Sequence, residues 1–166
     1  MLCDVRPRGS ECANKDLRGQ VSWPGLSQHP LLYVGEWDTR HPGAQSMFLV
    51  RDGKIVWQYS IPLRAPSGGN QEFDDVTMLP NDNIVYACMS GAGIITPHKR
   101  IVWEFKCPPG TETHSCQPIG QDSVLMVLIG TPLKVLIINT ATGKTLREII
   151  VSTTSTTHMV SFVMYG

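Results

Sequence analysis

The sequence lacks any excess of charge and any long apolar run. Its 166 residues carry 14 lysines and arginines against 14 aspartates and glutamates, and neither sign is gathered into a block. Such a chain offers no strongly basic surface to duplex nucleic acid or to an anionic membrane, so we expect neither partner. No stretch reaches the roughly 20 apolar residues of a membrane helix. The apolar run 123–130 has the length of a strand.

The N-terminus also lacks the apolar core of a secretory signal peptide. Residues 1–29 show no periodic pattern and are predicted to form an irregular leader, followed by one domain over 30–166. The chain has five cysteines, an odd number without CxxC spacing. This pattern favours buried or partly buried free thiols over a disulfide framework, and it does not indicate a compartment.

What the chain does have is a repeated phrase. Lys-Ile-Val-Trp-Gln-Tyr at 54–59 returns as Arg-Ile-Val-Trp-Glu-Phe at 100–105 and, more weakly, as Lys-Thr-Leu-Arg-Glu-Ile at 144–149. The spacings are 46 and 44 residues. A period of roughly 40–50 residues built from short strands is typical of a β-propeller blade. The sequence therefore predicts an all-β chain, a β-propeller of four-stranded antiparallel blades.

Turn signals divide the repeat region into about three blades. The predicted units are 31–62, which lacks its first strand, then 72–108 and 113–151, and the start of a further unit at 157–166. Propellers close with about four to eight blades, so an open stack of this size leaves strand edges exposed. We therefore expect a fragment of a longer propeller, or self-association through those edges. A sandwich-like collapse of the three sheets is the alternative.

Strands are expected wherever an apolar run lies between turn residues. The expected ranges are 31–37, 46–50 and 55–61, then 73–79, 84–89, 94–96 and 101–106, and finally 114–119, 123–129, 135–139 and 145–151. The glycine-rich stretch 90–93 is assigned to a turn, because no helix follows it as a phosphate-binding loop requires. Trp57 and Trp103 recur in the last strand of their units and are predicted to pack between blades.

Aligning the units brings three ionisable residues to one position. An offset of 40 residues places Asp74 over His114, and the Thr-His pair at 113–114 recurs at 157–158. The first strand of a blade lines the propeller channel, so Asp74, His114 and His158 are predicted to converge at one channel mouth. Together they could bind a divalent metal or supply acid–base chemistry. Alternatively, polar residues begin these strands only because the channel is wet. With Asp75 and Gln117, these residues form the predicted ligand-binding set.

The phrase Asp-Asp-Val-Thr-Met-Leu-Pro-Asn-Asp-Asn-Ile-Val at 74–85 resembles the first strand and turn of bacterial propellers of the quinoprotein-like (PQQ-like repeat) group. Ile-Val-Trp-Glu-Phe at 101–105 resembles their closing strand, and the likeness covers about 31–165. It implies a secreted or periplasmic binding or scaffold module, whose partner at the rim is a small molecule, a glycan or a protein. Many members of the group bind no quinone, and no residue here specifically supports one.

A weaker likeness to arylsulfotransferase-type propellers implies an enzyme in which His114 is the sulfate-accepting nucleophile. Asp74 replaces the histidine in the unit that matches the phrase best, which argues against this activity. A lyase or hydrolase that uses a metal in the channel is the other enzymatic alternative. The sequence favours the binding module and does not name its ligand.

Overall fold

The computed structural model describes residues 14–15, 21–22, 29–35, 43–65 and 68–151 of the chain. Within these ranges every regular element is a β-strand, which confirms the prediction of an all-β chain. The described part contains no helix that could cross a membrane. Two short strands, β1 (Asn14–Lys15) and β2 (Val21–Ser22), pair with each other inside the leader that the sequence predicts to be irregular.

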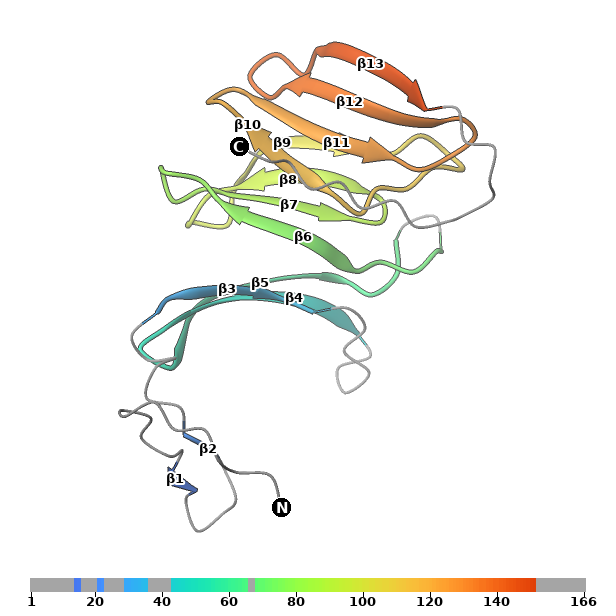
Figure 1. Ribbon diagram of the computed structural model, residues 1–166. Coiled ribbons are helices and arrows are strands. Elements are labelled where there is room, and N and C mark those ends of the chain that lie inside the picture. Colours follow the sequence, from blue (N-terminus) through green and yellow to red (C-terminus); the bar gives the residue numbers. More distant parts are fainter. Residues whose placement is uncertain (1–13, 16–20, 23–28, 36–42, 66–67, 152–166) are drawn as a thin grey trace, which may run out of the picture.

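The remaining strands form three antiparallel sheets, in each of which consecutive strands are neighbours. Sheet I contains β3 (Leu31–Val34), β4 (Ala44–Arg51) and β5 (Lys54–Pro62). Sheet II contains β6 (Phe73–Met78), β7 (Ile84–Cys88), β8 (Gly91–Ile95) and β9 (Ile101–Lys106). Sheet III contains β10 (Cys116–Ile119), β11 (Ser123–Leu128), β12 (Leu133–Asn139) and β13 (Thr145–Val151). Figure 1 shows the sheets stacked face to face, with sheet II between the other two.

Strand β8 begins at Gly91, inside the stretch that the sequence predicts to be a turn. The reason is packing. Gly93 pairs with Tyr86 on β7, and a Cβ atom at Gly93 would lie 2.6 Å from the Tyr86 hydroxyl oxygen. A Cβ atom at Gly91 would lie 2.0 Å from the carbonyl oxygen of Phe105. Both glycines therefore admit a close neighbour within the sheet, a role that glycine often has in strands.

The central sheet, sheet II, is covered on both faces at β7, because the side chains of this strand point alternately into two hydrophobic clusters. Tyr86 and Cys88 belong to a cluster with sheet I that includes Met47 and Phe73, whereas Val85 and Ala87 belong to a cluster with sheet III. Successive side chains of a strand point to opposite faces, so every residue of β7 is buried in one cluster or the other.

The two recurrent tryptophans lie at the contacts between sheets, as the sequence predicts. Trp57 on β5 packs against the cluster between sheets I and II, and its Nε1–H donates a hydrogen bond of 2.8 Å to the carbonyl oxygen of Pro97. Trp103 on β9 is buried in the cluster between sheets II and III. Each indole thus joins its own sheet to the next one in the stack.

Candidate functional site

A β-bulge recurs at the start of sheets II and III. On β6, Phe73 pairs with Cys88 and Asp75 pairs with Ala87. Asp74 is therefore an extra residue that has no pairing residue on β7. Before β10, Glu112 bridges to Ile129 and Cys116 pairs with Met126, so the three residues 113–115 oppose only two on β11.

Beyond the bulges, each pair of residues on β10 and β11 is numbered 40 higher than the equivalent pair on β6 and β7. Met78 pairs with Ile84 on sheet II, and Pro118 pairs with Val124 on sheet III. Asp74 and His114 therefore occupy equivalent positions in the two sheets, as the alignment of the units predicts.

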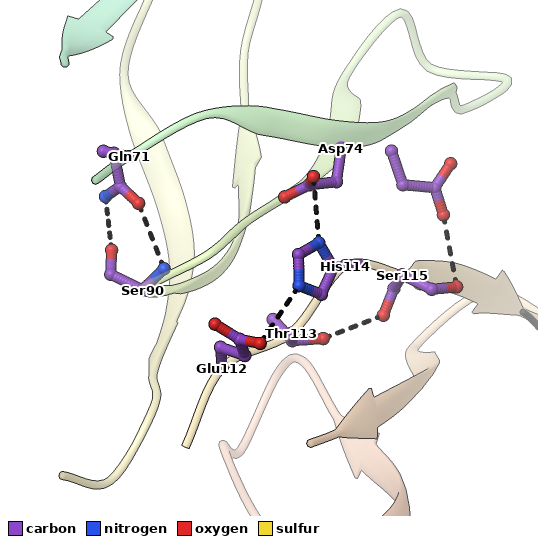
Figure 2. Close-up of polar contacts among 8 residues, drawn as sticks. Gln71, Asp74, Ser90, Glu112, Thr113, His114 and Ser115 are labelled. Atoms are coloured by element: carbon purple, nitrogen blue, oxygen red, sulfur yellow. Dashed lines mark hydrogen bonds and ion pairs between the residues drawn. The ribbon is translucent and has the colours of Figure 1, made fainter. Parts of the chain in front are cut away.

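These equivalent positions are in direct contact across the two sheets. His114 Nδ1 lies 3.0 Å from Asp74 Oδ1, and His114 Nε2 lies 3.4 Å from Glu112 Oε1 (Figure 2). Glu72 is buried beside them, and ligand atoms of Glu72, Asp74 and His114 all lie within 4.8 Å of one another. We call Glu72, Asp74, Glu112 and His114 the carboxylate–histidine cluster.

The imidazole of this cluster is held in its charged form. The hydrogen bond with Asp74, and more weakly the contact with Glu112, raises the pKa of His114 to about 9, although partial burial opposes the rise. Because both ring nitrogens face carboxylates, both act as N–H donors. Within the described residues, His114 is the charged partner of both Asp74 and Glu112.

Within the described residues, one carboxylate oxygen of Asp74 has no hydrogen-bond partner. The Asp74 side chain is only 6% exposed, and its Oδ2 atom is buried without a hydrogen bond from any residue of the described part. Leaving a buried polar atom unsatisfied costs about 1–3 kcal/mol, and more for a charged group. Such an atom in a native fold calls for an explanation, for example an ion or water bound to it.

Both strand starts are anchored on the turn between β7 and β8. The Gln71 side chain accepts a hydrogen bond of 3.0 Å from the Ser90 backbone N–H and also donates to the Ser90 hydroxyl. The buried Thr113 donates its backbone N–H to the carbonyl oxygen of Met89 at 3.3 Å. Each anchor directly precedes a member of the cluster, Glu72 or His114. Figure 2 shows the two hydrogen bonds between Gln71 and Ser90.

Asp75 also lies at the contact between sheets II and III, where its carboxylate already accepts hydrogen bonds. Its Oδ2 atom accepts hydrogen bonds from the Cys116 backbone N–H at 3.1 Å and from the Ser115 hydroxyl at 3.4 Å. Burial raises the pKa of Asp75, and these hydrogen bonds counteract part of the rise. Asp75 therefore ties sheet II to sheet III.

The other predicted ligand residues are not joined to the cluster. Gln117 lies on β10 opposite Leu125, and no hydrogen bond or ion pair within the described residues connects it to the cluster. His158 lies outside the described residues. Of the five predicted residues, the structure thus brings Asp74 and His114 into one cluster. It adds Glu72 and Glu112, which the sequence analysis missed although they too are 40 residues apart.

The cluster opens to solvent on the side of its histidine. The His114 side chain is 37% exposed and that of Glu112 is 40% exposed. A hollow of about 410 Å³ borders Glu112, with Ser90, Cys107 and the Pro-Pro-Gly turn at 108–110 in its lining. A small ligand therefore has access to Glu112 and His114, the two exposed members of the cluster, from this side.

The cysteines of the described part contribute no reactive thiolate. Cys88, Cys107 and Cys116 are free, as the sequence predicts, and Cys88 and Cys116 are buried. Burial raises the pKa of Cys107 and of Cys116 to about 12, and it also raises the pKa of Cys88. The neutral thiol is a poor nucleophile and a poor metal ligand. The two remaining cysteines of the chain lie in the leader, outside the described residues.

Comparisons with known proteins show a likeness of fold. No protein-family model matches the chain, and no curated protein matches it. The crystal structure of a protein of unknown function from Bacteroides caccae is similar, with a TM-score of 0.57 and 22% sequence identity. The match covers 73% of this chain and 40% of that one, so this chain spans less than half of the length of that protein. At this identity the likeness concerns the fold alone.

Proposed function

We propose that this chain is part of a β-propeller that acts as a binding module and takes a cationic ligand at the carboxylate–histidine cluster. The propeller is supported by the repeat spacing, by the consecutive strand order within each sheet and by the face-to-face stacking of the sheets. The similarity to a chain of more than twice the matched length agrees with a fragment of a longer array. The observation that carries the ligand class is the unpaired, buried oxygen of Asp74.

Charge favours a cation at this position. Asp74 and Glu112 share a single imidazolium, so these three groups together are one charge negative at neutral pH. A third carboxylate, that of Glu72, is buried within 4.8 Å of Asp74 and His114. Charges interact more strongly in a buried, low-dielectric site than in water. A positively charged ligand is therefore attracted here, and an anion such as sulfate is repelled.

The same geometry disfavours the arylsulfotransferase alternative. A histidine nucleophile needs an unprotonated nitrogen, whereas both nitrogens of His114 face carboxylates and its pKa is raised to about 9. The surrounding carboxylates would also repel an arylsulfate. For the metal-dependent lyase or hydrolase, the described residues offer no observation beyond the cluster itself. The quinone of the PQQ-like group likewise has no residue in its favour.

Calorimetric titration of the purified chain tests the proposal. The probes are putrescine, as an organic diammonium ion, and the chlorides of Mn²⁺, Zn²⁺ and Ca²⁺. We expect at least one of them to bind with a stoichiometry of one per chain. Asp74→Asn should weaken that binding at least tenfold, because it removes the buried charge. The matched control is Asp122→Asn in an exposed turn, which should leave binding unchanged. Equal affinity in both variants, or no binding by any probe, contradicts the proposal.

A further inference from the structure

We infer that the cation bound by the cluster is a divalent transition-metal ion, with Glu72, Asp74 and His114 as its protein ligands and Glu112 as a positioning residue. The inference rests on the proposed function and names the ligand of the same site. Three observations carry it: the spacing of the ligand atoms, the unpaired oxygen of Asp74, and the placement of carboxylates on both sides of the imidazole.

The spacing of the ligand atoms suits a metal. Tetrahedral ligands that each lie about 2.1 Å from one ion are about 3.4 Å apart. The candidate atoms of Glu72, Asp74 and His114 lie within 4.8 Å of one another. Side-chain shifts on the order of 1 Å would therefore bring them into coordination. The anchors on the Met89–Ser90 turn hold both contributing segments close to this arrangement.

The unpaired oxygen of Asp74 is an independent indication that a ligand binds at the cluster. The cluster would be a self-sufficient ion-pair bridge between sheets if every carboxylate oxygen were satisfied. Asp74 Oδ2 is not, although its side chain is only 6% exposed. A metal ion would use this atom and remove the cost of leaving it buried without a partner. The neighbouring backbone donor of Cys116 is unavailable to it, because that N–H already donates to Asp75.

The donor set decides the kind of metal. Calcium and magnesium prefer oxygen ligands throughout. An imidazole among the ligands suits zinc, iron, copper or nickel instead, and zinc also accepts carboxylate oxygens. Only three ligands come from the described protein, so further positions would stay open to water or to a second ligand entering from the exposed side of His114.

Glu112, the fourth residue of the cluster, is placed to orient the imidazole ring of His114. When His114 Nδ1, on the side of Asp74, binds the metal, its proton leaves to the solvent and Nε2–H continues to donate to Glu112. A carboxylate that accepts from the far nitrogen of a metal-binding histidine fixes the ring and raises its basicity. The loss of such a group commonly weakens metal binding by about 10- to 100-fold.

Cobalt titration of the full chain, stripped of metal with a chelator and dialysed, tests this assignment. We expect one Co²⁺ per chain, visible d–d absorption that changes with the ligand set, and displacement of the cobalt by Zn²⁺. Asp74→Asn and His114→Gln should each lower the affinity at least tenfold and alter the spectrum. Glu112→Gln should lower the affinity and leave the spectrum nearly unchanged. The exposed His98→Gln is the matched control and should have no effect.

The outcomes separate this inference from the proposed function. If putrescine or Ca²⁺ binds in a manner sensitive to Asp74→Asn while Co²⁺ and Zn²⁺ do not bind, the inference is wrong and the proposed function stands. If no cation binds, both are wrong. Cobalt binding that survives both Asp74→Asn and His114→Gln places the metal elsewhere and overturns the assignment. Glu72→Gln serves as an additional ligand variant if circular dichroism shows that either of the others is unfolded.

Discussion

The two contacts that sheet II makes are built from different chemistry. Toward sheet I it presents aromatic rings: Phe73 meets Tyr86 edge-on at 5.6 Å between centroids, and Tyr59 lies 6.4 Å from both. Toward sheet III it presents small and aliphatic side chains, such as Val85 and Ala87. Only the contact with sheet III also carries, within the described residues, the carboxylate–histidine cluster.

The difference follows from which strands meet. Sheet III begins with β10, the equivalent of β6, so the bulges of two first strands lie next to each other. Sheet I has three strands in the described residues, and its β3 corresponds to β7, the second strand of sheet II. The position equivalent to Asp74 is therefore not represented in sheet I. The polar cluster thus lies where two first strands are neighbours, whereas sheets I and II are joined mainly by apolar packing and by the hydrogen bond from Trp57 to Pro97.

The largest effect is expected from breaking the aromatic contact. Phe73 is completely buried between sheets I and II, so Phe73→Ala should leave a cavity and lower the free energy of unfolding by about 3–5 kcal/mol. Urea denaturation followed by circular dichroism measures the loss. Tyr33→Ala is the control, because this ring is 53% exposed and its removal should cost much less. Comparable losses in the two variants would show that the aromatic contact does not hold sheet I in place.

A smaller loss is expected at the contact between sheets II and III. Asp75→Ala would leave the Cys116 backbone N–H buried without its acceptor, which should cost about 1–3 kcal/mol in the same measurement. Asp75→Asn retains an acceptor oxygen and should cost less. If the asparagine variant is as unstable as the alanine variant, the negative charge rather than the hydrogen bond joins these sheets.

The smallest effect is a dependence of stability on pH. The pKa of His114 is raised from 6.5 to about 9 in the fold, through Asp74 and Glu112, with Glu72 also facing the cluster. The stability contributed by the imidazolium is therefore fully present below about pH 6.5 and is lost as the pH rises through about 9. In metal-free protein, the difference in melting temperature between wild type and His114→Gln should shrink from pH 6.5 to 10. Because the side chain is 37% exposed, solvent screening keeps this difference small. A constant difference would exclude titration of His114 as its source.

Much of this arrangement could be predicted from the sequence because the chain repeats itself. The Trp-bearing phrase marks the outer strands, and the 40-residue offset pairs Asp74 with His114. The same offset pairs Glu72 with Glu112, and alternation along a strand puts each of them on the same face as the residue two positions later, Asp74 or His114. Only the bulge, visible in the register, aims Asp74 and Asp75 at the same neighbouring sheet. The glycines of β8 could not be assigned either, because their need for space arises from Tyr86 and from the backbone of Phe105 across the sheet.

The bulge that recurs in sheets II and III places one ionisable side chain at the equivalent position of each of these two sheets. At that position sheet II carries Asp74 and sheet III carries His114, so an ion pair that belongs to neither hydrophobic core joins the two sheets. Each further sheet stacked in the same register would add one more ionisable side chain at the equivalent position. The charge of such a stack could then change by one residue per sheet, while the packing between the sheets stays the same.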